Sequence, residues 1–305
     1  MKSLKAINQK NVNKLIVICG PTASGKTNIA HQFAKNNNAE IVNADSMQLY
    51  EQLPIITASP ASKLKEEIPY HLYNFLDASC HYSVAKYTEI AAETIKKIAK
   101  RNCLPVLVGG SGMYINALIN GLSYIPEISQ QTRTQSKELQ KSLGQEAFFN
   151  LLKQTDHRIA NHLNAQDSQR VARAYEVYLQ TGNSILSYQK NPIKPLPEFK
   201  IKVIFVLPER DFLYSMCDKR LMEMFQSGGI EEVEKLLNEN RNITLSVTKA
   251  LGVEEITNYL HGKISKEQAL EIAQKRTRQY AKRQITWFKH QLQDKVTIDP
   301  LKETI

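Results

Sequence analysis

The stretch Gly20–Thr27, with the sequence GPTASGKT, constrains the fold of this chain more than any other feature. It has the spacing G-x-x-x-x-G-K-[ST] and follows the short apolar run Leu15–Cys19. In such a loop the glycines let the backbone curl, so that its N–H groups surround an anion at the N-terminal end of a helix. Lys26 adds a positive charge, and Thr27 offers a hydroxyl group to Mg²⁺. The residues that we expect to bind phosphate are Gly20, Pro21, Thr22, Ala23, Ser24, Gly25, Lys26 and Thr27.

Four short apolar runs predict buried parallel strands. Each is bounded by polar or glycine-rich residues, and helical patterns lie between them, including one at Lys26–Lys35 and one at Ser83–Arg101. Strands that alternate with helices predict an α/β fold, here a P-loop NTPase-like parallel sheet flanked by helices. The functional groups are then expected at the carboxyl ends of the strands. The expected strands are Leu15–Cys19, Glu40–Ala44, Pro105–Val108 and Ile201–Leu207.

The segment 123–199 differs from the rest of the chain. It is rich in Gln, Ser, Asn and Lys, contains no convincing strand pattern, and closes on the proline-rich stretch NPIKPLPEFK. Apolar residues at helical spacing run through it. We therefore predict an inserted all-helical domain at 123–199, which divides the α/β core into 1–122 and 200–305.

Basic side chains outnumber acidic ones, with 40 Lys and Arg against 30 Asp and Glu and a net charge of +10. Such an excess attracts polyanions, of which nucleic acid is the first candidate, although a basic chain need not have a specific partner. A long helix is expected to begin after Ser265, which forms a capping box with Gln268. This helix is rich in Lys and Arg, and its aromatic residues Trp287 and Phe288 are expected to pack it onto the sheet.

Asp45 is the acidic residue that follows an expected strand directly. An enzyme that hydrolyses nucleoside triphosphates normally carries an Asp at the end of a second strand, but here the third strand is followed by Gly109, Gly110 and Ser111. A carboxylate beside a phosphate site suits a general base. The alternative is that Asp45 only caps the turn after its strand.

The motifs taken together resemble one family, the tRNA dimethylallyltransferases (tRNA isopentenyltransferases), in their bacterial form. GPTASGKT looks like the family's own phosphate loop, and NADSMQLY is similar to its Asp-Ser-x-Gln-x-Tyr motif. PVLVGGSGMYINAL resembles its Gly-Gly-Thr-Gly-x-Tyr turn, with Ser111 where the family usually has Thr. DSQRVARAYEVYLQTGNSI resembles its Gln-Arg-x-x-Arg-Ala-x-Glu-Val helix. YHLYNFLD, YSVAKY, RLMEMFQSGGIEEV and TRQYAKRQITWF are further matches, in the family's order.

This resemblance implies a reaction. Dimethylallyl diphosphate gives its dimethylallyl group to N6 of the adenosine 3′-adjacent to the anticodon, in tRNAs that read codons beginning with U. The products are N6-dimethylallyladenosine and pyrophosphate. The phosphate loop would then hold the diphosphate of the prenyl donor, and no phosphoryl group would be transferred.

The resemblance also implies roles for individual residues. Asp45 is expected to accept the proton of the amine, while Lys26, Arg220 and Thr27 with Mg²⁺ stabilise the leaving diphosphate. The adenosine must leave the stack of the anticodon loop to reach a buried pocket. The residues expected to contact tRNA are Asp45, Ser46, Met47, Gln48, Ser111, Arg133, Gln169, Arg170, Val171, Ala172, Arg173 and Arg283.

Two segments depart from the family pattern. ITASP at Ile56–Pro60 lacks the family's Gly and Lys, and GVEE at Gly252–Glu255 lacks its Tyr, which puts the local contacts of these segments in doubt. Three other functions remain open: a P-loop kinase or nucleotide transferase for small molecules, an RNA-binding protein with an inactive loop, and an isopentenyltransferase for free adenine nucleotides. We expect a cytoplasmic monomer that has no membrane span, because the longest apolar runs are too short to cross a bilayer.

Overall fold

The computed structural model describes residues 13–190, 192–239 and 247–303 of the chain. These residues form two compact units. The first unit combines Met1–Ile119 with Pro195–Ile305, and the second unit is Asn120–Lys194. The sequence predicted an insertion at 123–199, so the second unit begins and ends a few residues earlier than expected.

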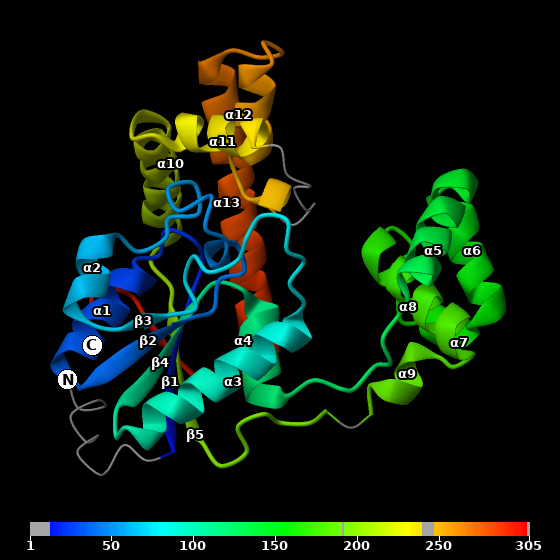
Figure 1. Cartoon of the computed structure of the whole chain (residues 1–305), viewed down its shortest axis with the longest axis horizontal. Helices are drawn as coiled ribbons and strands as arrows, with labels where there is room; N and C mark the ends of the chain where they lie inside the picture. Colours follow the sequence, from blue (N-terminus) through cyan, green and yellow to red (C-terminus); the bar gives the residue numbers. More distant parts are fainter. Residues whose placement is uncertain (1–12, 191, 240–246, 304–305) are drawn as a thin grey trace. The chain divides into compact units, whose positions relative to one another are not determined.

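The first unit is built on one parallel sheet with the strand order β3-β2-β4-β1-β5-β6 (Figure 1). Strand β1, which leads into the phosphate loop, lies between β4 and β5. Because the strands are parallel, the segments that follow β1, β2, β4 and β5 all leave the same edge of the sheet. The strands are β1 Lys14–Cys19, β2 Ala39–Asn43, β3 Tyr70–His71, β4 Leu104–Gly109, β5 Lys200–Val206 and β6 Lys295–Ile298.

Helices cover both faces of this sheet (Figure 1). Ser83 caps the N-terminus of α3, because its side chain accepts a hydrogen bond from the backbone N–H of Lys86. The predicted capping box of Ser265 and Gln268 begins α13, with both of its hydrogen bonds present. The helices of this unit are α1 Lys26–Asn36, η1 Met47–Leu49, α2 Ser62–Glu67, α3 Val84–Lys100, α4 Gly112–Asn120, α10 Arg210–Gln226, α11 Gly229–Asn238, η2 Val247–Lys249, α12 Val253–Leu260 and α13 Lys266–Gln291.

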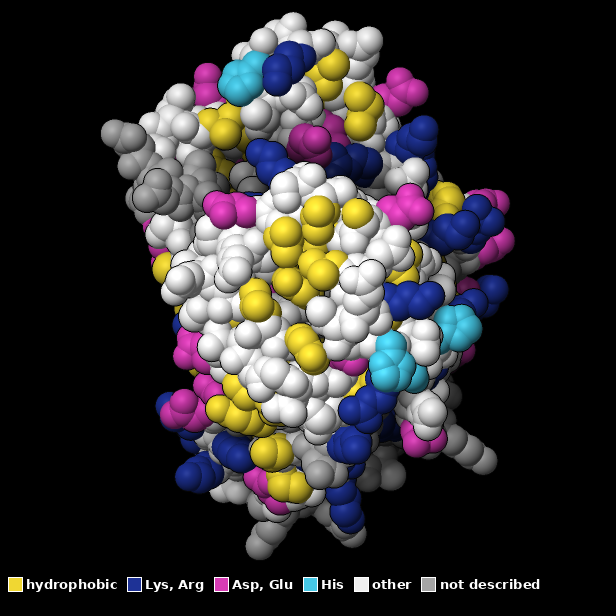
Figure 2. Space-filling model, turned by 90° about the vertical axis from the view of Figure 1, so that its right-hand side faces the viewer, with side chains coloured by type: hydrophobic (Ala, Val, Ile, Leu, Met, Phe, Trp, Pro, Cys, Tyr) yellow, Lys and Arg dark blue, Asp and Glu magenta, His cyan; other side chains and the backbone are white. Residues whose placement is uncertain are grey.

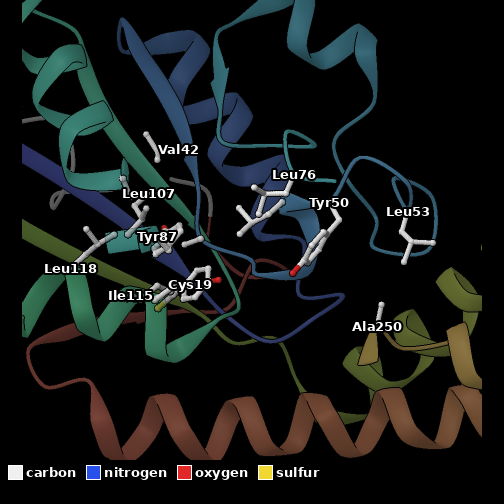
Figure 3. Close-up of a cluster of buried hydrophobic side chains, with 14 of the residues drawn as sticks. Cys19, Val42, Tyr50, Leu53, Leu76, Tyr87, Leu107, Ile115, Leu118 and Ala250 are labelled. Atoms are coloured by element: carbon white, nitrogen blue, oxygen red, sulfur yellow. The ribbon is translucent and has the colours of Figure 1, made fainter. Parts of the chain in front are cut away.

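The core of the first unit has two layers, one on each face of the sheet. Alternate residues of a strand point to opposite faces, so Val17 and Ile18 of β1 enter different layers. Val17 belongs to the larger layer, which Figure 3 shows around Tyr87 of α3 and Ile115 of α4. Ile18 packs with Phe33 of α1 in the smaller layer. The phosphate loop therefore begins from a strand that is buried on both sides.

The second unit is helical and has a core of its own. Phe148, Val171 and Tyr175 are buried in it, and the rings of Phe148 and Tyr175 meet edge to face with their centroids 5.0 Å apart. A bridge between Leu122 and Ile193 joins the two ends of the unit. Its helices are α5 Gln130–Leu143, α6 Gln145–Thr155, α7 His157–Ala160, α8 Ser168–Thr181 and α9 Ile185–Tyr188.

The four predicted strands are present, with ends that differ by one residue, and two further strands were not predicted. Strand β3 has only two residues, and β6 is a short edge strand with exposed side chains at Val296 and Thr297. Neither has the apolar run that marks a buried strand. In the described part of the chain, no helix combines the length and the hydropathy that a bilayer crossing requires.

Candidate active site

The phosphate loop joins β1 to α1 and has two glycines that it needs for different reasons. Gly25 has φ of +81°, a left-handed conformation that glycine adopts without strain. Gly20 is needed for space, because a Cβ there would lie 2.6 Å from the carbonyl oxygen of Val206 on β5. Ala23 also has positive φ, at 62°, and packs beside Leu213 and Cys217 of α10. The curled backbone predicted for this loop is confirmed at these positions.

Two cations lie at this loop. Nζ of Lys26 donates a hydrogen bond to the carbonyl oxygen of Pro21 at 3.2 Å. Burial lowers the pKa of Lys26 from 10.5 to about 8, an effect that Asp45 partly offsets and that Arg220 strengthens. Burial also lowers the pKa of Arg220, whose guanidinium donates to the hydroxyl oxygen of Thr22. Arg220 comes from α10 and is only partly exposed, so it belongs to the loop rather than to a solvated helix surface.

The charges at the loop do not balance. Burial lowers the pKa values of Lys26 and Arg220, and the carboxylate of Asp45 is the acidic side chain that raises both of them. A bound anion offsets this excess of one positive charge and replaces the water that burial removes. The electrostatics therefore match a phosphate or diphosphate ligand.

Asp45 follows β2, and its two carboxylate oxygens have different surroundings. Oδ1 accepts a hydrogen bond from the backbone N–H of Met47 at 3.1 Å, while the Asp45 N–H donates to Oδ1 of Asn43 at 2.8 Å. Oδ2 faces the turn after β4, since a Cβ on Gly110 would lie 3.6 Å from it and 3.3 Å from the carbonyl oxygen of Gly20. Asp45 therefore caps its own turn with one oxygen and presents the other toward the start of the phosphate loop.

Ser111 holds the Asp45 turn in place. Its hydroxyl oxygen accepts a hydrogen bond from the backbone N–H of Ser46 at 2.9 Å and contacts the Ser46 hydroxyl at 3.2 Å. Its own N–H donates to the carbonyl oxygen of Ala44 at 3.0 Å. The hydroxyl that was expected to contact substrate is thus engaged within the protein, where it fixes the segment that carries Asp45.

Gln48 has a similar internal role. Its Nε2 donates to the carbonyl oxygens of Thr57 and Ala58, both at 2.9 Å, which ties η1 to the loop at 53–59. The neighbouring Met47 is partly buried against the core. The amide nitrogen of Gln48 is therefore occupied, and a contact with a flipped base remains a prediction for Oε1 alone.

One residue of the site was missed by the sequence prediction. Gln284 of α13 is buried, with 6% of its side chain exposed, and its Oε1 accepts the backbone N–H of Thr22 at 2.8 Å. Its Nε2 donates to the carbonyl oxygen of Gly110 at 2.9 Å. The signal was its spacing, because Ala281 and Phe288 mark the buried face of α13 and Gln284 is a polar residue on that same face.

Aromatic side chains pack around the carboxyl ends of β2 and β4. The rings of Tyr87 and Tyr114 are stacked with centroids 3.8 Å apart, and the Tyr87 hydroxyl donates to the carbonyl oxygen of Asn43 at 2.7 Å. A Cβ on Gly112 would lie 2.4 Å from the ring of Trp287, so that α4 can begin there only with a glycine. Burial and the nearby Asp45 raise the pKa of Tyr280. The site thus combines charged groups with apolar walls.

Phe288 packs into the core, as predicted, and its ring centroid lies 5.5 Å from that of Phe205 on β5. Arg283 lies over the ring of Tyr280 with its guanidinium carbon 5.8 Å from the ring centroid. Apart from this cation–π contact, the nitrogens of Arg283 make no hydrogen bond to another described residue. A contact of Arg283 with tRNA remains a prediction.

The predicted RNA-binding residues of the second unit have different exposures. Arg170 is 76% exposed and Arg173 is 39% exposed, and they pair with Asp167 at 3.3 Å and with Glu176 at 3.4 Å. Val171 is fully buried in the core of this unit, and its contact with tRNA stays a prediction. Ala172 is partly buried, whereas Arg133 and Gln169 are exposed.

Positive charge is not gathered at one place on the face that Figure 2 presents, where Lys and Arg lie at many separate points among Asp and Glu. Individual arginines have to be tested for RNA contact one by one.

Comparison with known proteins points to one family. The model of the IPP transferase family matches residues 48–291. A tRNA dimethylallyltransferase of Rickettsia bellii is 48% identical over 287 residues, which cover 94% of this chain and 91% of that protein.

Two solved structures have the same fold. The tRNA isopentenylpyrophosphate transferase of Bacillus halodurans is 32% identical, with a TM-score of 0.67 over 94% of this chain and 90% of that one. A eukaryotic dimethylallyltransferase acting on tRNA is 28% identical, with a TM-score of 0.79 over 95% of this chain and 75% of that one. On the match to the family model and the identity with its curated relative, this chain belongs to the IPP transferase family.

Proposed function

We propose that the protein transfers the dimethylallyl group of dimethylallyl diphosphate to N6 of the adenosine 3′-adjacent to the anticodon of tRNA. Membership of the IPP transferase family and the curated relatives named tRNA dimethylallyltransferase support this activity. The observation that carries it is the pair of partly buried cations, Lys26 and Arg220, opposite the single carboxylate of Asp45 at the phosphate loop. The tRNAs that we expect to react are those that read codons beginning with U.

The donor half of the reaction uses the phosphate loop. The diphosphate gathers negative charge as its bond to the allylic carbon breaks, and the loop amides, Lys26 and Arg220 stabilise that charge. The hydroxyl oxygen of Ser24 is buried and has no hydrogen-bond partner among the described residues, so it is an unused polar group inside the loop. A phosphate oxygen supplies the partner that this hydroxyl lacks.

The acceptor half uses Asp45. The exocyclic amine of adenine is a weak nucleophile, because its lone pair is delocalised into the ring. As the nitrogen bonds to the allylic carbon, Oδ2 of Asp45 accepts its proton, while Oδ1 keeps its hydrogen bond with Met47. The carbon–nitrogen bond thus forms, the carbon–oxygen bond breaks, and its electron pair leaves with pyrophosphate.

Mg²⁺ fits the groups that the loop presents. The hydroxyl of Thr27, at the start of α1, makes no hydrogen bond with another described residue, and a hydroxyl oxygen is a ligand that Mg²⁺ accepts. Within the described ranges no group of three or more His, Cys, Asp or Glu side chains could hold a metal ion. This donor set suits a Mg²⁺ ion that is carried mainly by substrate phosphates and water. When bound, the ion would neutralise part of the charge of the departing diphosphate.

We propose that tRNA contacts both units of the chain. The exposed Arg170 and Arg173 would bind backbone phosphates, and Arg133 and Gln169 would add polar contacts. Ser46, Met47 and Ser111 would shape the pocket for the adenosine, next to Oε1 of Gln48 and the guanidinium of Arg283. We also propose that the protein acts as a monomer in the cytoplasm.

A small-molecule kinase is the main competing function. Strand β4 ends at Gly109 and is followed by Gly110 and Ser111 instead of an acid, and Glu209, which follows β5, is exposed to solvent. A phosphoryl-transfer enzyme needs carboxylates that hold Mg²⁺ against a γ-phosphate. The arrangement therefore favours a reaction in which diphosphate is the leaving group over a reaction in which a phosphoryl group is transferred.

The experiment compares three acceptors. In two reactions the protein is incubated with Mg²⁺ and dimethylallyl diphosphate labelled in the prenyl group, with either an unmodified tRNA anticodon stem-loop or AMP as acceptor. In the third reaction the acceptor is a small-molecule alcohol and ATP is added as phosphate donor. Label in the stem-loop alone is the expected result. Label in AMP alone would identify an enzyme for free nucleotides, and transfer of phosphate from ATP would identify a kinase.

A further inference from the structure

Gln284 lies beside the site but reaches no substrate position. Both ends of its side-chain amide are used within the protein, at 2.8 Å to the Thr22 N–H and at 2.9 Å to the carbonyl oxygen of Gly110. Removal of one partner of a buried hydrogen bond costs free energy, because the other partner stays unsatisfied. The amide of Gln284 is therefore committed to joining two segments of backbone.

The two segments are the two halves of the reaction site. Thr22 is in the phosphate loop, and its hydroxyl accepts a hydrogen bond from Arg220. Gly110 precedes Ser111, whose hydroxyl holds the Ser46 N–H at 2.9 Å, next to Asp45. A series of direct hydrogen bonds thus runs from the anion-binding loop through Gln284 to the turn that carries the carboxylate.

The fit around this amide is tight and its support is rigid. A Cβ on Gly110 would lie 2.4 Å from Nε2 of Gln284, so the turn can come this close to the amide only with a glycine at position 110. Gln284 sits within α13, a helix of 26 residues whose neighbouring turns are anchored by the fully buried Ala281 and Phe288. Groups on such a helix are held more precisely than groups on a loop.

The chemistry of the amide explains why glutamine is needed. The side chain must accept from an N–H and donate to a carbonyl oxygen at the same time, and a neutral amide does both. A carboxylate could accept but not donate, and it would add negative charge beside Asp45. A methionine of similar length could do neither.

We propose that Gln284 is a positioning residue that fixes the separation between the phosphate loop and the Asp45 turn. It acts through Thr22 and Gly110 and touches neither the donor nor the adenosine. This inference rests on the proposed transfer of a dimethylallyl group, because its effect is the alignment of the allylic carbon with the amine and with Oδ2 of Asp45.

The test uses Gln284→Met and Gln284→Glu, with Gln274→Met as the matched control. Gln274 lies on the same helix and donates from Nε2 to the carbonyl oxygen of Asp218 on α10 at 3.1 Å, so its amide joins two helices and makes no bond to Thr22 or Gly110. All variants are made in the full chain, and activity is expressed per folded molecule from the amplitude of thermal unfolding. Binding of inorganic pyrophosphate is measured by calorimetry.

Gln284→Met is expected to lower kcat about tenfold or more and to weaken pyrophosphate binding by a similar factor, with the KM for the tRNA stem-loop unchanged. Gln274→Met is expected to change the melting temperature alone. Equal kinetic effects of the two variants, or an unchanged kcat in Gln284→Met, would overturn the proposal.

Gln284→Glu gives a second test that does not depend on the folding of the methionine variant. A protonated carboxyl can accept from Thr22 and donate to Gly110, whereas the carboxylate cannot donate. The activity of this variant relative to the unaltered protein is therefore expected to rise as the pH falls, and a constant ratio contradicts the proposal. If the unaltered protein transfers no label to RNA, the proposed function fails, but pyrophosphate binding still decides whether Gln284 supports the loop.

Discussion

The backbone N–H of Thr22 donates a hydrogen bond to Oε1 of Gln284, a residue 262 positions further along the chain. The contact brings the first loop and the last long helix of the first unit to the same point. The same helix also meets α10 through an ion pair between Arg278 and Asp218. The site is therefore assembled from segments at both ends of the chain, with the phosphate loop held from outside by helices that follow the inserted unit.

Asp45→Asn is expected to lower kcat for prenyl transfer by about 10²- to 10⁴-fold, because the amide can still accept the Met47 N–H but cannot accept the proton of the amine. Binding of the tRNA stem-loop and the melting temperature should change little. Steady-state kinetics with labelled donor and thermal unfolding provide the measurements.

The matched control is Asp77→Asn, because Asp77 also accepts a backbone N–H, that of Ser79, at 2.9 Å. Its turnover should be close to that of the unaltered protein. Full activity of Asp45→Asn would leave Asp45 with its capping role alone.

The affinity for the donor is expected to depend on pH through Lys26. Its pKa in the protein is about 8, lowered from 10.5 by burial, so its ammonium charge is present below pH 8 and is lost as the pH rises through that value. A diphosphate binds better to the charged form, and KM for dimethylallyl diphosphate should therefore rise above pH 8. The profile of kcat/KM against pH measures this.

Lys26→Arg provides the control for this profile, because a guanidinium stays charged throughout the range. Its kcat/KM is expected to be lower than that of the unaltered protein, since the hydrogen bond to Pro21 changes, but flat around pH 8. The same rise of KM in Lys26→Arg would assign the pH dependence to another group.

Arg170→Ala is expected to weaken tRNA binding and to reduce the slope of log K against log salt concentration by about one, because one phosphate contact and its released counterion are lost. Lys97→Ala on α3 is the control, since Lys97 pairs with Glu93 at 2.7 Å and our proposal gives it no contact with RNA. Titrations of the stem-loop at several salt concentrations give the slopes. A slope of Arg170→Ala equal to that of the control would exclude the phosphate contact.

Glu40 makes a separate contribution to stability at the opposite end of the sheet strands. It is buried, and its Oε2 accepts hydrogen bonds from His71 at 2.6 Å and from Arg101 at 2.7 Å. Burial raises the pKa of Glu40, but these two hydrogen bonds outweigh burial and hold its pKa below the ordinary value of 4.5.

Because the folded pKa of Glu40 is depressed, its stabilising effect is present above the ordinary pKa of Glu and is lost as the pH falls through the folded value. Glu40→Gln is therefore expected to lower the free energy of unfolding by about 1–3 kcal/mol at pH 7 and by less at pH 3. Urea unfolding at both pH values measures this. Glu93→Gln, at an exposed side chain, should have little effect at either pH, and an equal effect of both variants would contradict the account.

The parts of the site that the sequence predicted are those that depend on neighbours along the chain. The phosphate loop needs one strand before it and one helix after it, and all three are contiguous. Asp45 could be placed because it follows directly on a buried strand. The capping box of α13 is likewise local, since it joins Ser265 and Gln268, which are three positions apart.

The parts that were missed depend on distant segments. The sequence around Gln284 does not indicate that Thr22 and Gly110 are its hydrogen-bond partners. Strand β6 forms by pairing with the edge of β5, which is also distant in the sequence. The resemblance covers the whole of α8, whereas Val171 lies on its buried face and is fully enclosed in the core of the second unit. Helical periodicity can separate the two faces of α8, but it does not decide which exposed residues bind RNA.

The central claim is that the phosphate loop releases a diphosphate while Asp45 accepts the proton of an adenine amine. The most direct measurement follows doubly labelled dimethylallyl diphosphate, with one label in the prenyl group and the other in the diphosphate, in a single turnover with an unmodified anticodon stem-loop. The account predicts prenyl label on N6 of one adenosine and an equal amount of free labelled pyrophosphate, with both reduced in parallel by Asp45→Asn. Diphosphate label in the RNA, or prenyl transfer that Asp45→Asn leaves unchanged, would contradict it.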